Sequence, residues 1–402
     1  MKLYKKILFI IILLIVYIYV CNISMLPNNI ILMQGDLLKL NTIFGVNIKG
    51  NETMQASSNL NNSIVAETGK MDLNLSLFNI FGVKDVTVNV IPKTKVIPIG
   101  KAIGMKMYTE GVLVVGMSEI EGQKPYEKTG IEAGDKIIEI NKNEINSTDE
   151  LIECVNNSNG KELEIKYISD EKEEYTNIIP VKTANNEYKL GLWVRDAAAG
   201  VGTLTFYEPS TGSFGALGHG INDVDTYELI DIASGELVTT NIVDIVKGMD
   251  GSPGEIRGSI DNGVTIGSIN KNTGFGVYGN VKNISRLNLT NQEEMDVANR
   301  SEIKTGKAEI LCELENGKIE KYEIEIQKIF IDNNENNKSM LLKVTDEKLL
   351  EKTGGIIQGM SGAPIIQNGK FIGAVTHVLV NDSKVGYGVF ADLMIKQMRE
   401  VK

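Results

Sequence analysis

Residues 359–364 read Gly-Met-Ser-Gly-Ala-Pro, and this glycine-bracketed serine decides how the rest of the chain is interpreted. Apolar runs flank it, Gly355-Ile356-Ile357 before and Ile365-Ile366 after, so we expect a tight turn between strands. Glycines let the backbone kink until two N–H groups point at one spot beside the serine oxygen. With the N–H groups of Gly359 and Ser361 as donors, this turn would form an oxyanion hole.

A serine nucleophile needs a general base, and the chain has only two histidines, His219 and His377. His219 lies in the turn Gly218-His219-Gly220, where a ring is held and yet reachable. His377 lies inside the apolar stretch 374–379, so we expect it to pack beside the site. We therefore predict that His219 is the base and Ser361 the nucleophile. The histidine precedes the serine, as in chymotrypsin-type enzymes.

A third group must orient the base, and three carboxylates are candidates. Asp223 and Asp225 are close to His219 in sequence, and Asp346 lies just ahead of Ser361. The residue pattern alone does not choose among them.

Several segments of the second half of the chain resemble one peptidase family. They are Trp193–Asp196, Gly202–Phe206, the turn Gly215–Gly220 with Asp223, Asp225 and Thr226, and Gly359–Pro364. Together they resemble the SpoIVB peptidases, the stage IV sporulation protein B serine peptidases of endospore-forming bacteria. The resemblance implies that His219 is the base, Ser361 the nucleophile and Asp346 the orienting carboxylate. Because Asp346 lies so close to Ser361 in sequence, chymotrypsin itself is only an analogy at the level of the fold.

The same resemblance implies a role in sporulation signalling. Such enzymes are secreted across the forespore membrane into the space between the two membranes. There they cleave themselves near the N-terminus and cleave an anchored regulator of an intramembrane protease, which activates a mother-cell sigma factor. The polar stretch 51–62 is the expected self-cleavage region. Two alternatives are a non-catalytic PDZ scaffold and a general quality-control serine protease of the cell envelope.

Residues 96–181 resemble a PDZ domain. The resemblance rests on Ala133–Asn141, an amphipathic helix over Thr148–Val155 that Ser147 or Thr148 would cap, and closing strands. PDZ domains bind a peptide or a protein C-terminus as an added strand. The resemblance implies that Ala102, Ile103, Gly104 and Met105 form the carboxylate-binding loop.

The N-terminal residues 1–26 combine Lys2, Lys5 and Lys6 with an unbroken apolar run from Ile7 to Cys21. This pattern predicts a signal anchor whose lysine end stays in the cytoplasm, and a cleaved signal peptide is the alternative. Residues 28–95 follow as a β-rich region, and 188–402 form the peptidase domain. The expected fold is mainly β, with a PDZ domain before a trypsin-like double β-barrel.

Composition excludes several other classes of function. The net charge of −11 and the absence of a basic stripe argue against a nucleic-acid partner. Cys21, Cys154 and Cys312 are too few and too scattered for a disulfide framework. We expect no metal and no cofactor, because no histidine or cysteine cluster has ligand spacing. The Gly-x-Gly-x-x-Gly match at 274–279 lacks the following helix of a dinucleotide site, so we read it as strands and a turn.

Overall fold

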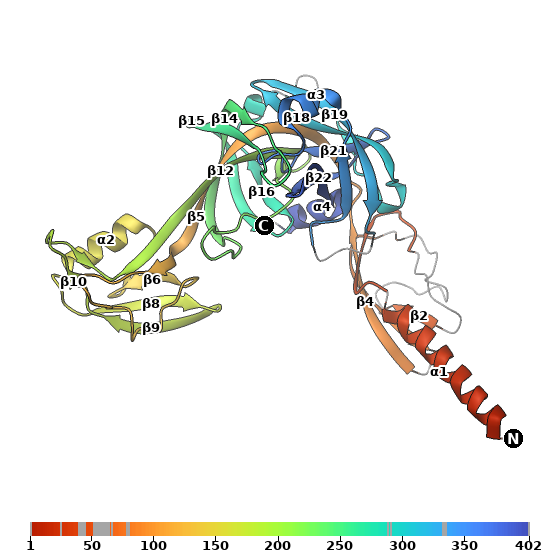
Figure 1. The fold of residues 1–402 in the computed structure, drawn as a ribbon, viewed down its shortest axis with the longest axis horizontal. Coiled ribbons are helices and arrows are strands. Elements are labelled where there is room, and N and C mark those ends of the chain that lie inside the picture. Colours follow the sequence, from red (N-terminus) through yellow and green to blue (C-terminus); the bar gives the residue numbers. More distant parts are fainter. Residues whose placement is uncertain are drawn as a thin grey trace.

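The computed structural model describes residues 2–24, 26–38, 46–50, 65, 67–77, 81–287, 289, 292–331 and 336–400. Strands dominate this part of the chain. Two adjoining barrels form the centre, a unit carrying helix α2 extends from one side, and helix α1 extends from the other (Figure 1). The predicted mainly β fold is confirmed.

The first barrel is a ring of six strands. In ring order β12, β13, β16, β15, β14 and β5 pair in turn, and β5 pairs back onto β12. Large side chains such as Phe214 and Leu237 fill its interior. The strands are β5 (Lys95–Met117), β12 (Leu192–Glu208), β13 (Ser213–Ala216), β14 (Ile232–Val246), β15 (Glu255–Thr273) and β16 (Gly276–Val281).

The second barrel is closed by six antiparallel pairings. Its strands are β18 (Gly306–Glu315), β19 (Lys318–Ile329), β20 (Met340–Val344), β21 (Pro364–Gln367), β22 (Lys370–Leu379) and β23 (Asp382–Phe390). Helix α3 (Glu347–Thr353) follows β20, and helix α4 (Ala391–Arg399) packs against β22. Short elements η1 (Ile284–Leu287), β17 (Met295–Asp296) and η2 (Arg300–Glu302) connect the barrels. Two six-stranded barrels in series match the predicted trypsin-like architecture.

A PDZ-like unit, residues 118–190, is inserted between β5 and β12. Helix α2 (Thr148–Asn157) begins as predicted at Ser147, whose hydroxyl accepts the N–H of Glu150 at 3.2 Å. Leu151 and Val155 bury one face of the helix against the sheet. The other elements are β6 (Lys136–Ile140), β7 (Asn143–Glu144), β8 (Leu163–Ser169), β9 (Lys172–Ile178), β10 (Val181–Lys182) and β11 (Tyr188–Lys189).

The prediction that residues 102–105 form a carboxylate-binding loop is wrong. Residues 102–105 lie inside β5, between β12 and β14, where Ile103 pairs with both Gly202 and Thr239. Ala102, Ile103 and Met105 are buried. A strand-like pattern does not specify which sheet receives the strand, and here β5 gives its first half to the first barrel and its second half to the PDZ-like unit. The barrel therefore begins ahead of residue 188.

The N-terminal region contains a helix and a separate small sheet. Helix α1 (Lys2–Ser24) includes Lys6–Ser24, which is long and apolar enough to cross a membrane. Strands β1 (Asn29–Met33), β4 (Phe81–Ile91), β3 (Gly69–Leu77) and β2 (Val46–Gly50) pair in that order. The expected self-cleavage region, 51–62, lies outside the described residues.

The Gly-x-Gly-x-x-Gly match at 274–279 is confirmed as strands and a turn. Gly274 and Phe275 connect β15 to β16, which pair antiparallel from Thr273 and Gly276. No helix follows directly, so the segment lacks the strand–turn–helix geometry of a dinucleotide site.

Candidate active site

The Ser361 turn has the open N–H groups that an oxyanion hole requires. Gly359 and Gly362 hold left-handed φ angles of 94° and 96°, which a residue with a side chain rarely adopts. In this turn the N–H groups of Met360 and Gly362 donate to the carbonyl oxygens of Ile357 and Val375. Within the described part of the chain, the N–H groups of Gly359 and Ser361 have no acceptor. These are the two donors that the sequence predicted.

Strand β12 of the first barrel holds this turn in place. The Thr203 N–H donates to the Ser361 carbonyl at 3.1 Å, and the Thr203 hydroxyl donates to the Gly359 carbonyl at 2.7 Å. A Cβ on Gly362 would lie 2.3 Å from the Thr203 carbonyl and 2.6 Å from the Leu217 nitrogen. The nucleophile turn of the second barrel therefore packs directly on first-barrel backbone, and only glycine fits at 362.

The turn that carries His219 is itself strained. Leu217 has a φ of 69°, an uncommon value for a residue with a side chain, and Gly218 follows at 71°. His219 Nδ1 lies 2.7 Å from the Gly220 carbonyl oxygen. Because a carbonyl only accepts, Nδ1 carries the proton and Nε2 is left as the free base nitrogen. Burial lowers the pKa of His219 from its usual 6.5, although the Gly220 bond opposes this, so the neutral base is favoured near neutral pH.

The two glycine turns meet across the interface of the barrels. A Cβ on Gly218 would lie 3.1 Å from Thr376 Cγ2 and 3.4 Å from Ala374 Cβ, so the turn rests against β22. Ser361 Oγ donates to the Thr376 carbonyl at 2.7 Å. The next residue, His377, places its ring centroid 4.9 Å from that of His219. The structure thus gathers the predicted nucleophile, the predicted base and the second histidine around one short piece of β22.

Asp346 occupies the N-cap of α3. Its carboxylate accepts the Leu349 N–H at 2.9 Å and the Glu323 N–H at 3.2 Å. Among the described residues, no hydrogen bond or ion pair joins Asp346 to His219. The structure therefore places the Ser361 and His219 turns against the same strand, β22, and leaves Asp346 in a capping position.

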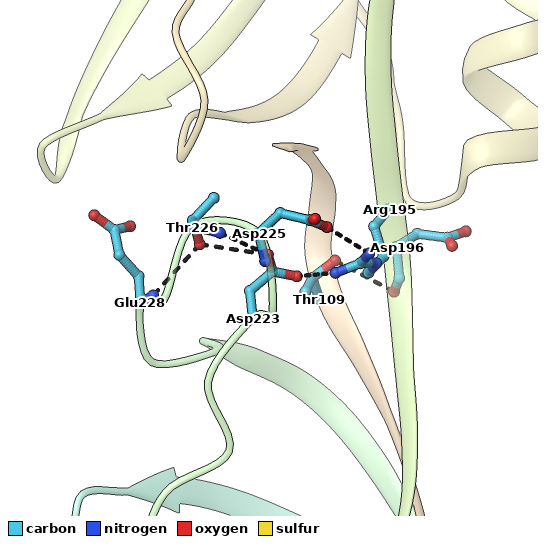
Figure 2. Close-up of polar contacts among 7 residues, drawn as sticks. All are labelled: Thr109, Arg195, Asp196, Asp223, Asp225, Thr226 and Glu228. Carbon is cyan, nitrogen blue, oxygen red and sulfur yellow. Dashed lines mark hydrogen bonds and ion pairs between the residues drawn. The ribbon is translucent and has the colours of Figure 1, made fainter. Parts of the chain in front are cut away.

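The other two candidate carboxylates, Asp223 and Asp225, both bind Arg195. Arg195 donates to Asp223, and its other terminal nitrogen lies 2.7 Å from Asp225 Oδ2 (Figure 2). Asp223 also accepts the N–H groups of Asp225 and Thr226. Burial raises the pKa of Asp223, but these N–H groups and Arg195 outweigh it and hold that pKa below its usual value.

Sequence reasoning missed two residues of this site. Thr203 belongs to the Gly202–Phe206 segment, but a threonine inside a strand gives no sign that its hydroxyl holds a turn 156 positions later. Arg195 likewise lies far from its partners along the chain. Their roles emerge only when the strand is placed between the two turns.

The site contains nothing suited to a metal. Within the part of the chain that the structure describes, no group of three or more histidine, cysteine, aspartate or glutamate side chains could hold one. The chemistry that these residues can perform is nucleophilic attack by a serine hydroxyl with a histidine base.

Comparisons with solved structures find matches to parts of the chain. The PDZ domain of the SdrC-like protein of Listeria monocytogenes is 24% identical and covers 21% of this chain and 87% of its own, with a TM-score of 0.19. The active form of the Rv3671c protease from M. tuberculosis is 13% identical and covers 51% of this chain and 74% of its own, with a TM-score of 0.29. No curated protein matches the chain.

Family models give the decisive comparison. The PDZ domain model matches residues 100–179, which include most of the inserted unit and part of β5. The model for the SpoIVB peptidase S55 family matches residues 186–395, more than half of the chain, and includes both glycine turns. The chain therefore belongs to the SpoIVB peptidase S55 family and is a serine endopeptidase with a PDZ domain.

Proposed function

We propose that Ser361 is the nucleophile and His219 the general base of this peptidase. The Ser361 hydroxyl attacks a peptide carbonyl while its proton passes to His219 Nε2. The N–H groups of Gly359 and Ser361 then bind the oxyanion of the tetrahedral intermediate. His219 returns the proton to the leaving amine, and water hydrolyses the acyl-enzyme by the same route.

One observation carries this assignment. Of the N–H groups between residues 358 and 363 in the described structure, those of Gly359 and Ser361 are without an acceptor. Gly359 and Ser361 are only half-buried, so a bound substrate can supply the acceptor that the fold does not. Their position on either side of Met360, next to the Ser361 hydroxyl, favours an oxyanion as that ligand.

Two groups can orient the His219 ring. The Gly220 carbonyl holds Nδ1–H in the resting structure. We retain Asp346 as the proposed orienting carboxylate, a role that rests on the family resemblance. Its two cap hydrogen bonds leave acceptor lone pairs on both oxygens.

We further propose that the enzyme acts in sporulation signalling. In this proposal helix α1 anchors it to the forespore membrane, and the bulk of the chain lies in the intermembrane space. It cleaves itself near the N-terminus and then cleaves an anchored regulator of an intramembrane protease. Membership of the peptidase family and the apolar N-terminal helix support this proposal. The PDZ domain would bind a peptide or a protein C-terminus.

A fluorophosphonate probe and N-terminal sequencing test the proposal together. The wild-type protein should take the label and appear as an N-terminally shortened form. Ser361→Ala should lose both. Ser383→Ala is the matched control, because Ser383 Oγ also donates to a backbone carbonyl, that of Gly354, in the same barrel. Labelling that survives in Ser361→Ala would contradict the nucleophile assignment, and a well-folded wild type that takes no label would favour a scaffold.

A further inference from the structure

The loop that carries His219 is fixed to the first barrel by Asn272 and by an ion-pair cluster around the buried Asp223. This loop, residues 217–231, connects β13 to β14. Its two ends are joined by Asn272, whose side chain bonds to Ile221 and Ile230. Its tip folds around Asp223, whose carboxylate accepts the N–H groups of Asp225 at 2.9 Å and Thr226 at 3.1 Å. The loop therefore has an internal structure with Asp223 at its centre.

Arg195 is the group that connects this centre to the rest of the protein. Its guanidinium donates to Asp223 and to Asp225 from β12, as Figure 2 shows. The Asp223 side chain is 1% exposed, and a buried carboxylate needs a compensating charge. Among the described residues, Arg195 is the only cation that forms an ion pair with it. A planar guanidinium can satisfy two carboxylates at once, which a lysine ammonium does less well.

The same strand reaches the other half of the active site and the PDZ-like unit. Eight positions further along β12, Thr203 binds both Gly359 and Ser361. The residue next to Arg195, Asp196, accepts the Thr148 N–H of helix α2 at 2.8 Å. The His219 loop also contacts the PDZ-like unit directly, because Asp231 of the loop forms an ion pair with Lys136 of the unit at 2.8 Å. Strand β12 thus sets the position of the nucleophile turn directly and that of the His219 loop through Arg195.

We propose that Arg195 is a positioning residue for His219. By binding Asp223 and Asp225 it holds the His219 loop in register with Thr203 and the Ser361 turn, and it does not touch the substrate. This inference rests on the proposed roles of His219 and Ser361. It extends them by identifying the contact that keeps base and nucleophile aligned.

The test compares Arg195→Ala with Arg195→Lys in the full chain. Arg300→Ala is the matched control, because Arg300 and Asp392 form another buried ion pair, at 2.6 Å, that joins η2 to α4. We expect Arg195→Ala to slow fluorophosphonate labelling by about 100-fold, the typical effect of misplacing a catalytic group. Arg195→Lys should recover part of the rate, and added guanidinium ion should partly rescue Arg195→Ala. Arg300→Ala should label at the wild-type rate.

Hydrogen exchange measures the stability of the His219 loop independently of catalysis. In a Ser361→Ala background, Arg195→Ala should speed hydrogen exchange at the amides of Asp225 and Thr226 by about tenfold or more, as local opening does, while Arg300→Ala should not. Unchanged exchange, or equal loss of labelling in Arg300→Ala, overturns the inference. If the wild type takes no label at all, the proposed function fails. If the wild type is labelled and Arg195→Ala is labelled at the same rate, the inference about Arg195 fails while the proposed function stands.

Discussion

The hydroxyl of Thr203 donates a 2.7 Å hydrogen bond to the carbonyl oxygen of Gly359, and this bond links the first barrel to the oxyanion turn of the second. Gly359 presents its N–H toward the proposed oxyanion and its carbonyl toward Thr203. That carbonyl belongs to the 359–360 peptide, next to the 358–359 peptide that carries the Gly359 N–H. A residue of the other barrel therefore holds the adjoining peptide and, through it, the position of the donor. A small displacement of one barrel relative to the other would therefore move the oxyanion donors.

Replacing Thr203 by valine should reduce both kcat and stability. The loss of one buried hydrogen bond costs about 1–3 kcal/mol, and a misplaced oxyanion donor lowers kcat by on the order of 10-fold or more. Thr205→Val is the control from the same strand, because the Thr205 hydroxyl is buried without a partner. That change should leave activity intact and leave stability equal or higher. Steady-state kinetics and denaturant titration measure both effects. Equal losses of activity in the two variants would contradict a specific role for Thr203.

Gly362→Ala should destroy the site. The new Cβ would lie 2.3 Å from the Thr203 carbonyl at a φ of 96°, so the two barrels must separate locally. We expect a loss of several kcal/mol in the free energy of unfolding and no labelling by the serine probe. Gly369→Ala is matched in backbone conformation, with a φ of 73°, but meets no atom within 4 Å. It should cost only about 1–2 kcal/mol and keep full activity.

Two histidines make the pH dependence directly measurable. Burial lowers the pKa of His219 below 6.5. His377 is more exposed, but partial desolvation of its ring, together with the charges of His219 and Lys338, lowers its pKa to about 4. The base must be neutral, so activity should fall as the pH drops through the His219 pKa, at a midpoint below 6.5. NMR titration of the two ring signals should give one pKa below 6.5 and one near 4. His377→Phe leaves one signal and thereby assigns both.

The same shifts predict how stability changes with pH. Both histidines have depressed pKa values in the folded state, so folding favours their neutral forms. Their contribution is complete above the unfolded pKa of about 6.5 and declines as the pH falls from there toward 4. As the pH is lowered through this window, the denaturant midpoint of the wild type should therefore fall relative to that of His377→Phe. A wild-type midpoint that rises relative to the variant toward low pH would contradict the assigned direction.

The sequence could predict the reacting residues but not their support. Ser361 and His219 could be recognised in the sequence because each is flanked by glycines, and a catalytic serine or histidine needs such a tight turn to be held and yet accessible. The destination of residues 95–110 could not be predicted, since an alternating strand fits a PDZ sheet as well as a barrel wall. The cluster of Arg195 with Asp223 was equally hidden. Charged side chains that are distant in sequence show no pattern until the strands are placed.

Asp346 is the residue for which the resemblance and the resting geometry differ most, and asparagine separates its two possible roles. Asparagine caps a helix as well as aspartate does, so Asp346→Asn should keep the bond to Leu349. Its amide nitrogen cannot accept the Glu323 N–H, and the loss of that one bond should cost about 1 kcal/mol. Asp346→Ala should lose both bonds and about 2 kcal/mol. If Asp346 orients His219 in the working enzyme, as the family resemblance implies, asparagine should still lower kcat by up to about 10⁴-fold through the wrong tautomer.

The expected result is thus a stable but slow Asp346→Asn protein, checked by acylation kinetics beside denaturant titration. Near-normal turnover in that variant would leave Asp346 as a helix cap. The Gly220 carbonyl, already 2.7 Å from Nδ1, would then be sufficient to hold the imidazole. In that case Asp223→Asn should behave differently from Asp346→Asn, because it weakens the Arg195 contact that positions the whole loop.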